Sequence, residues 1–274
     1  MDHQQRMNGI ASIDFSQPDA VARAADEVRE CGAALLRNIL PQALIERLRH
    51  DLDRAAREDD ARFGAKHPFP GMVHALMLRG DSFLDLLDVS AVRAVAHALL
   101  GHGAIVHAFN SSSLPPHDTN YAGRIHVDSP RHIAGYATNI GMAFPLDEFT
   151  AQNGAMEIWP ASFRIPSMPA AEEFERNKVV LESLRPGDAV CFNSRCWHQS
   201  GVNSTGRWRR AVTINVCRAY MRQQFDFPRM FPSDVAARLS DELRQFLGFH
   251  VRMPASMDEF LAPAEQRPYR PGQE

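Results

Sequence analysis

The feature that most constrains the fold is a change in the spacing of apolar residues near Ala104. Before this point, apolar residues recur three and four positions apart, which is the spacing of helices that pack against a core. After it, short apolar runs alternate with turn residues, as in a sheet of many short strands. A helical first third followed by seven or eight strands predicts a mainly β protein with flanking helices, built on a jelly-roll core.

The spacing also sets the bounds of the expected elements. Helices are expected over 18–31, from Pro41 through Leu52, and over 81–87, 90–100 and 233–247, with one early strand over 33–40. The later strands are expected over 105–110, 123–128, 136–146, 155–159, 179–184, 189–193 and 210–218. Loop composition marks 59–71, an inserted lid 163–177 and a flexible Pro-rich tail 263–274.

We expect these elements to form one domain over 1–274, because β-sandwiches and barrels of this length often form a single domain. Helical residues 1–103 are expected to buttress a core over 104–218, and a C-terminal helix and tail occupy 225–274.

Composition argues against several classes of partner. A net charge of -3 provides no basic face for nucleic acid. The first residues lack an apolar signal segment, and no run approaches the roughly 18 apolar residues of a membrane span. The four cysteines have neither the spacing nor the density of a disulfide framework. We therefore expect a cytoplasmic protein with reduced thiols, while the sequence leaves its oligomeric state open.

His126-Val127-Asp128 carries the clearest chemistry. In an extended strand, residues two positions apart face the same way, so His126 and Asp128 can bind one metal ion together. Two imidazoles and a carboxylate leave further metal positions open, which is the arrangement of non-haem Fe(II) oxygenases. A candidate for the second imidazole is His198, in Cys-Trp-His-Gln-Ser-Gly. Because twelve histidines and 33 acidic residues can produce His-x-Asp by chance, the motif needs support from its surroundings.

The supporting motifs run in order from Arg124 to Arg218. After His-Val-Asp come Asn153-Gly154, Pro160-Ala161-Ser162, Arg185-Pro186-Gly187-Asp188, Trp197-His198-Gln199-Ser200-Gly201-Val202-Asn203 and Arg209-Arg210-Ala211. Together they resemble the phytanoyl-CoA dioxygenase family of Fe(II)/2-oxoglutarate-dependent oxygenases. The chain departs from the family pattern at Phe163, where members commonly have histidine.

The resemblance implies a cupin-like double-stranded β-helix core in which His126, Asp128 and His198 hold iron. It also implies that Arg209 binds the far carboxylate of 2-oxoglutarate with help from Ser200, since a planar guanidinium can form two parallel hydrogen bonds to a carboxylate.

Arg207 and Arg210 are the alternatives to Arg209 as the carboxylate-binding residue. On a strand through Arg209, Arg210 points to the opposite face, and Arg207 lies near the preceding turn, so Arg209 is favoured.

Other contacts of the site stay open at this point. A further 2-oxoglutarate contact is expected from His107, Asn110 or Ser112, and the spacing does not choose among them. Candidate substrate contacts are Asn139 and Phe144, on the strand after the metal motif, and Arg131 and His132, close behind Asp128.

Several residues have a plainer interpretation. His102, His107, His117 and His132 have no supporting motif as metal ligands. Cys191 and Cys196 lie near His198 and are expected in the core rather than in a thiolate metal site.

The function implied is an Fe(II)/2-oxoglutarate-dependent dioxygenase that converts 2-oxoglutarate and O2 to succinate and CO2 while oxidising a small molecule. Hydroxylation is favoured, because Asp128 occupies the position that related halogenases leave open for chloride. The substrate is expected in bacterial specialised metabolism and is not expected to be a CoA thioester. The alternatives are a non-catalytic cupin-like protein that binds a metal or metabolite, and a cupin-type metal enzyme independent of 2-oxoglutarate.

Overall fold

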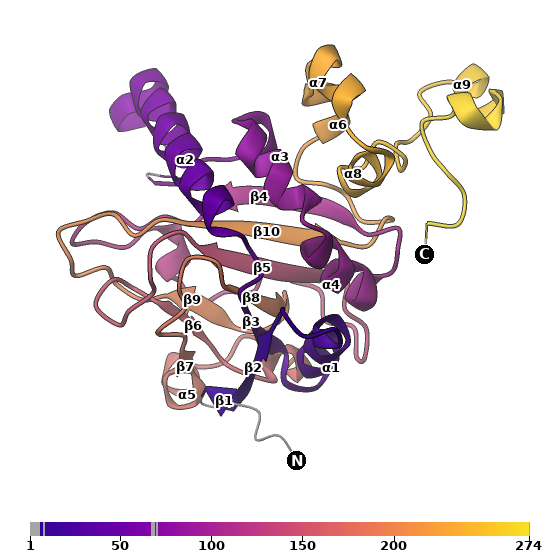
Figure 1. Ribbon diagram of the computed structural model, residues 1–274. Coiled ribbons are helices and arrows are strands. Elements are labelled where there is room, and N and C mark those ends of the chain that lie inside the picture. The colour runs from indigo at the N-terminus through magenta and orange to yellow at the C-terminus, as the bar shows by residue number, and fades with distance from the viewer. Residues whose placement is uncertain (1–5, 8, 67–68, 70, 274) are drawn as a thin grey trace.

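Two β-sheets form the centre of the molecule (Figure 1). A computed structural model of the chain describes residues 6–7, 9–66, 69 and 71–273. The larger sheet runs, in spatial order, through β1 (Arg6–Met7), β2 (Ile10–Asp14), β3 (Ala33–Arg37), β8 (Ala189–Asn193), β5 (Asn139–Pro145), β10 (Ala211–Cys217) and β4 (Ile105–Ser111). The smaller sheet runs through β7 (Val179–Val180), β6 (Met156–Ile158) and β9 (His198–Ser200). Only the pairing of β2 with β3 is parallel among the described strand pairs.

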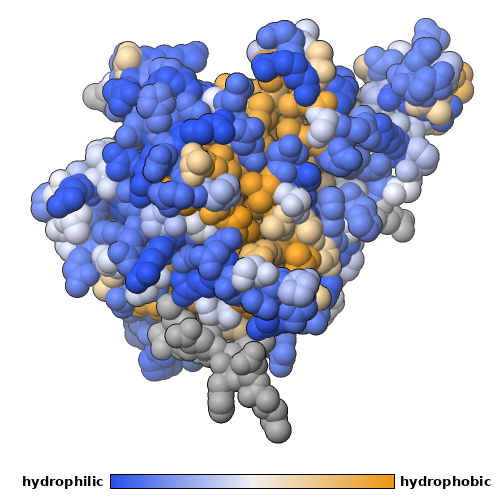
Figure 2. All heavy atoms as spheres, viewed as in Figure 1, coloured by the Kyte–Doolittle hydropathy of each residue, from blue (hydrophilic) through white to orange (hydrophobic). Residues whose placement is uncertain are grey.

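Helices cover one face of the larger sheet (Figure 1). They are α1 (Ala20–Cys31), α2 (Gln42–Phe63), α3 (Asp81–Asp88) and α4 (Ser90–Leu100). Each buries an apolar stripe, as α2 does with Leu44, Ile45, Leu48, Leu52 and Ala55. Figure 2 shows a largely hydrophilic periphery on this side, with hydrophobic residues gathered in the middle around α3 and α4.

The remaining helices are short. They are α5 (Ala171–Asn177), α6 (Phe227–Met230), α7 (Ser233–Arg238), α8 (Asp241–Phe246) and α9 (Met257–Leu261). Single turns of 3-10 helix are η1 (Gly64–Lys66), η2 (Leu76–Leu78), η3 (Tyr121–Gly123), η4 (Ser162–Arg164) and η5 (Ala264–Gln266). None of the described helices combines the length and apolarity that crossing a bilayer requires.

Strand β5 separates two apolar cores, so its side chains are buried on both faces. Ile140, Met142 and Phe144 pack into the core under the helices. Ala143 faces the other way, into a smaller core beside the three-stranded sheet. Between them, Gly141 permits close packing, since a Cβ there would lie 2.3 Å from the Phe192 ring. This smaller core forms one side of the space between the sheets.

The prediction of a strand over 123–128 is wrong. The chain forms η3 and then runs extended, joined to β9 only by an isolated bridge between His126 and His198. The backbone N–H of Asp128 donates to the carbonyl of Ser194, which lies in a turn, so the sheet does not continue past the bridge.

The end of α2 and the C-terminal segment also differ from expectation. Helix α2 continues to Phe63, into the expected loop, and its last turns are tied to Arg79 through Asp59. The helix expected over 233–247 is interrupted between α7 and α8. The described part of the tail is docked rather than loose, because Arg270 pairs with Asp241 and Tyr269 bridges to Val251.

Most other expected elements are confirmed. Strand 189–193 and helix 90–100 have the predicted bounds, and the helices and strands expected at 18–31, 33–40, 81–87, 105–110, 136–146, 155–159 and 210–218 are shifted or shortened by a few residues at most. Of 179–184 only β7 forms, and β2 was not expected.

Candidate active site

Two histidines and one aspartate converge between the sheets. His126 and His198 face each other through paired backbone hydrogen bonds of 3.0 Å in both directions. Asp128 Oδ1 lies 3.6 Å from His126 Nε2 and 3.7 Å from His198 Nε2. Donor atoms around one metal ion with bonds of about 2.1 Å lie roughly 3 to 3.5 Å apart, so these side chains need to move by only a few tenths of an ångström to share an ion. Within the described residues, these three side chains are the group of histidine, cysteine and acidic residues that lies close enough together to hold a metal ion.

The other ring nitrogens of both histidines are held by carbonyls. His126 Nδ1 lies 2.6 Å from the carbonyl oxygen of Arg124, and His198 Nδ1 lies 2.9 Å from that of Cys196. A carbonyl only accepts, so each Nδ1 carries the proton and donates it. Each Nε2 therefore keeps its lone pair for a metal, the tautomer that a metal ligand needs.

The charge of the trio also favours a cation. Burial, followed by the nearby His126, lowers the pKa of His198 to about 4, so its ring is neutral at physiological pH. Burial opposes ionisation of Asp128, but His198, His126 and the Asn215 amide outweigh it and lower the carboxyl pKa. Burial likewise disfavours a charged His126, and Asp128 more than offsets this, raising the imidazole pKa. The Asp128 carboxylate thus attracts positive charge to the place where the three side chains meet.

The trio opens into a cavity of about 450 Å³. Most of its exposed wall surface is apolar, although many of the lining residues, including those on β4, β9 and β10, have polar side chains. The lining residues are Phe69, Met72, His74, His107, Ala108, Asn110, Ser111, Ser112, Tyr121, Ala122, His126, Asp128, Ala143, Phe149, Met156, Phe192, His198, Gln199, Ser200, Arg209, Thr213, Asn215 and Gln224. Asp128 and Arg209 are the carboxylate and the guanidinium among them.

Arg209 is a buried cation in this wall. Only 2% of it is exposed, and within the described residues it forms no ion pair. Its side chain donates to the carbonyls of Gly154 (2.8 Å) and Ser112 (2.6 Å), lies 4.5 Å from the Phe149 ring centroid and leaves Nε without a partner in the described structure. Burial lowers its pKa to about 9, which still leaves a cation at neutral pH. An anionic ligand would stabilise such a group.

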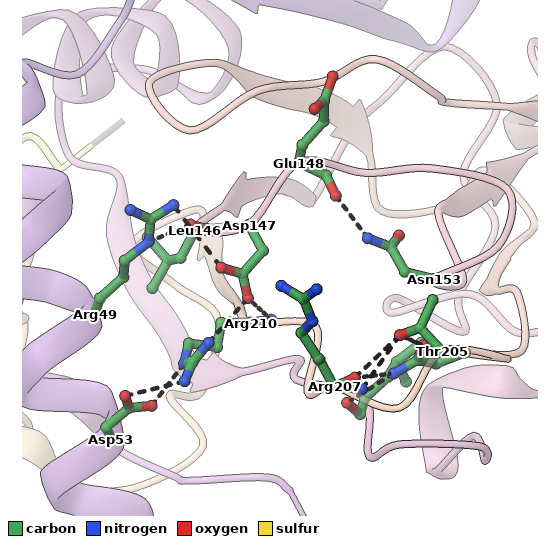
Figure 3. Close-up of polar contacts among 11 residues, drawn as sticks. Arg49, Asp53, Leu146, Asp147, Glu148, Asn153, Thr205, Arg207 and Arg210 are labelled. Carbon is green, nitrogen blue, oxygen red and sulfur yellow. Dashed lines mark hydrogen bonds and ion pairs between the residues drawn. The ribbon is translucent and has the colours of Figure 1, made fainter.

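The two alternative arginines do not face the cavity. Arg210 turns to the opposite side of β10, where it pairs with Asp53 of α2 (2.6 and 3.1 Å) and with Asp147 (3.3 Å), as Figure 3 shows. Arg207 is exposed in the turn before β10. Neither Arg207 nor Arg210 lines the cavity, so Arg209 is the one of the three candidate arginines that can contact a ligand there.

All three candidates on β4 and its end line the cavity, at different distances from Arg209. Ser112 supplies a carbonyl to Arg209. His107 lies five residues away, about 16 Å along an extended chain. It lines the cavity because β4 bulges where it pairs with Asn215 and Val216 of β10. Asn110 lies between them and donates to Gln224 (3.2 Å).

The four candidate substrate contacts do not line the cavity. Phe144 was expected to face it and does not, because it lies on the helix side of β5 in the main core. Asn139 lies on the face of β5 that is directed toward the cavity, but it is behind the lining residues, where its side chain donates to Asn215 (3.0 Å). Arg131 and His132 are in the loop after Asp128 and are not among the lining residues.

Two further expectations concern regions near the site. The segment 163–177 contributes no lining residue, so the expected lid does not cover the cavity here. Cys191 and Cys196 are buried in the two cores and remain thiols, as expected.

Sequence reasoning missed Asn215, Gln224 and the aromatic residues Phe69, Tyr121 and Phe149. Asn215 had a detectable signal: in Ala-Val-Thr-Ile-Asn-Val-Cys, Thr213 and Asn215 are polar at alternating positions of an otherwise apolar strand. Such polar residues inside a buried strand mark the face that lines a site. Gln224 had no such signal, because it comes from an irregular segment after β10.

Curated relatives support an oxygenase family. An uncharacterized protein of Mycobacterium tuberculosis (strain ATCC 25618 / H37Rv) is 27% identical over 90% of this chain and 94% of its own length. The dioxygenase andF of Emericella variicolor is 23% identical over 82% and 83%. The iron/alpha-ketoglutarate-dependent dioxygenase penM of Penicillium thymicola is 25% identical over 69% and 65%.

Solved structures share the fold. AviO1 from Streptomyces viridochromogenes Tue57 matches with a TM-score of 0.58 and 22% identity, over 72% of this chain and 94% of that one. The epimerase SnoN, solved with Fe3+, alpha ketoglutarate and nogalamycin RO, matches with a TM-score of 0.58 and 19% identity, over 83% and 94%. The chain thus shares the jelly-roll core of these structures. The phytanoyl-CoA dioxygenase (PhyH) model matches residues 28–211, and the chain belongs to this family.

Proposed function

We propose that the chain is an Fe(II)/2-oxoglutarate-dependent dioxygenase in which His126, Asp128 and His198 hold iron and Arg209 binds 2-oxoglutarate. Membership of a dioxygenase family with iron- and 2-oxoglutarate-dependent relatives supports the cofactors. The observation that carries the residue assignment is the buried guanidinium of Arg209, which has no carboxylate partner among the residues that the structure describes and shares a cavity with His126, Asp128 and His198.

Arg209 has the donors that a carboxylate needs. A guanidinium has five N–H groups, and two carbonyls take up at least one each from its terminal nitrogens. The unpartnered Nε–H and the remaining N–H groups are available for an anion. Ser200 lines the same cavity and can donate a further hydrogen bond. The ring of Phe149 beside the guanidinium keeps water away from it and strengthens the charge interaction.

Iron and 2-oxoglutarate, when bound, supply an O2-dependent oxidation that yields succinate and CO2. The protein holds their position and shields the site. Carbonyl hydrogen bonds fix both imidazole rings. Asp128 occupies the third position as a carboxylate, which favours hydroxylation or a related oxidation over halogenation. Apolar side chains such as Met156 and Phe192 exclude water around the trio.

The lining further indicates a neutral small-molecule substrate. Apart from Asp128 and Arg209, its side chains are apolar, aromatic, neutral polar or imidazole. The proposed cosubstrate carboxylate would take up Arg209, leaving no cationic side chain in the wall to bind a second anion. This argues against a CoA thioester or a free acid. A role in bacterial specialised metabolism is supported by the fold shared with SnoN, whose structure holds nogalamycin RO.

Cosubstrate turnover tests this function. Purified protein with Fe(II), 2-oxoglutarate and O2 should form succinate faster in the presence of a neutral metabolite fraction, with equimolar loss of one compound. His126→Ala and Arg209→Met should abolish the coupled reaction. Substrate oxidation that persists without 2-oxoglutarate would favour a cosubstrate-independent metal enzyme. Metal binding with no succinate under any fraction would favour a non-catalytic binding protein, and stimulation by an acidic fraction alone would contradict the neutral substrate.

A further inference from the structure

Asn215 contacts the oxygen of Asp128 that faces away from the histidines. The two Nε2 atoms approach Asp128 Oδ1, at 3.6 and 3.7 Å. The other oxygen, Oδ2, accepts a hydrogen bond of 3.3 Å from Asn215 Nδ2. The two oxygens of one carboxylate therefore have different partners, one toward the metal position and one toward β10.

The Asn215 amide is itself fixed in orientation. Its Nδ2 also donates to Ser194 Oγ (3.0 Å), and its Oδ1 accepts from Asn139 Nδ2 (3.0 Å). Asn215 is 7% exposed and Asn139 4%, so water competes little for these bonds. An amide with its oxygen engaged by one donor cannot flip without losing a buried hydrogen bond.

Ser194 holds the main chain of the same ligand. Its carbonyl accepts from the backbone N–H of Asp128 (2.9 Å) and of Ser129 (3.1 Å), and its own N–H donates to the Asn139 carbonyl (3.2 Å). Asp128 is thus fixed at its backbone by the turn after β8 and at its side chain by β10.

We propose that Asn215 is a positioning residue that retains Asp128 Oδ2, so that the carboxylate offers a single oxygen, Oδ1, to the metal. A carboxylate that binds through one oxygen leaves one more metal position for cosubstrate or dioxygen than a carboxylate that binds through two. Asn139 supports this function indirectly by orienting Asn215. The inference rests on the proposed iron site and adds a residue that the metal-ligand motif does not contain.

Cobalt(II) binding tests the inference without turnover, because its visible spectrum reports the number and geometry of the donor atoms. Asn215→Leu keeps a similar volume and removes the donor. We expect the dissociation constant for Co(II) to rise about tenfold, as for other partners of metal ligands, and the spectrum to change shape. Thr213→Val removes a polar group from the same face of β10 without touching Asp128, and its affinity and spectrum should match the unchanged protein.

The outcomes separate two failures. If the unchanged protein does not bind Co(II), the metal site itself is wrong. If it binds, and Asn215→Leu binds with the same affinity and spectrum, the site stands and the positioning function is overturned. Should Asn215→Leu fail to fold, Asn139→Ala provides the test: it should weaken Co(II) binding several-fold and shift the spectrum in part, and an unchanged spectrum would contradict the proposal.

Discussion

Arg209 differs from the other arginines around β10 in what binds it. Arg210 pairs with the carboxylates of Asp53 and Asp147, whereas the described partners of Arg209 are main-chain carbonyls and an aromatic ring. A guanidinium buried in this way is costly unless a ligand pairs with it. Its environment therefore indicates a binding function more strongly than its position in the sequence does.

Replacing Arg209 with methionine should weaken 2-oxoglutarate binding by about 100-fold, because losing charge-assisted hydrogen bonds costs roughly 3 kcal/mol. Metal affinity should change little, since Arg209 does not contact the trio. Calorimetric titration of 2-oxoglutarate into Mn(II)-loaded protein measures the effect. Arg207→Ala, at an exposed position of the same segment, is the matched control. Equal affinity in both variants would show that another group binds the cosubstrate.

For single residues, the sequence predicted the site where the functional side chains are a fixed number of positions apart. His126 and Asp128 are two residues apart, and Arg209 lies eleven residues after His198, so a motif can carry them. Phe144 was misplaced because strand β5 is buried on both faces, and alternation then gives no inside or outside.

The segment after β10 is an element that the strand pattern did not predict. Residues 218–227 cross the edge of β4, where Gln224 N–H donates to the His107 carbonyl (2.8 Å) and Gln223 Nε2 to that of Val106 (2.8 Å). His107 Nδ1 in turn lies 2.8 Å from the Arg222 carbonyl, which leaves Nε2 as an acceptor in the cavity wall. The segment thus completes one end of the site.

Gln223→Ala should loosen this segment, because Gln223 also donates to the Leu247 carbonyl (3.1 Å) and so joins β4 to α8. Losing these bonds, worth about 1 kcal/mol, should speed amide exchange at Gln224 about fivefold. Hydrogen exchange followed by mass spectrometry measures it, with peptides from α4 as the internal reference. An unchanged exchange rate at Gln224 would mean that the hydrogen bond from its own N–H to the His107 carbonyl is enough to hold the segment against β4.

The C-terminal tail should loosen in acid. Arg270 and His250 lower the pKa of Asp241 from 3.8 to about 2, Arg270 contributing most. A carboxyl pKa lowered in the folded state stabilises docking above about pH 4, and this contribution is lost as the pH falls toward 2. Because Asp241 is 61% exposed, the effect should stay below about 1 kcal/mol.

Hydrogen exchange of the Arg270 amide, bonded to the His250 carbonyl, reports this docking. After correction for intrinsic rates, protection should fall between about pH 4 and pH 2. In Asp241→Asn it should be low throughout and independent of pH. A pH dependence that survives in the variant would assign the acid sensitivity to another group.

Elements such as β8 and α4 were predictable from the sequence. In each, the apolar residues follow the spacing of a single type of element, and turn residues mark both ends. The segment 123–128 was not, because its alternation fits a strand while its backbone partner is a turn at Ser194. The docked tail depends on pairs such as Asp241 with Arg270, 29 residues apart, which no local pattern contains.

Across the whole molecule, apolar cores pack on both faces of the larger sheet, and three buried cysteines report on the integrity of this packing. Burial raises the pKa of the Cys191 thiol, and raises those of Cys196 and Cys217 to about 12. Thiols react as thiolates, so these three should resist iodoacetamide at pH 8. The partly exposed Cys31 should be modified first, and all four should react in denaturant. Mass spectrometry of the alkylated protein counts them; rapid modification of Cys191 in the native state would contradict this packing.

The central claim is that Asp128 and two histidines bind iron in the cavity that holds Arg209. Anaerobic addition of Fe(II) and 2-oxoglutarate to the purified protein, followed by visible spectroscopy, tests it most directly. A metal-to-ligand charge-transfer band should appear only with both components, and Asp128→Ala should abolish it. No band with the unchanged protein, or a band that Asp128→Ala leaves intact, would contradict the claim.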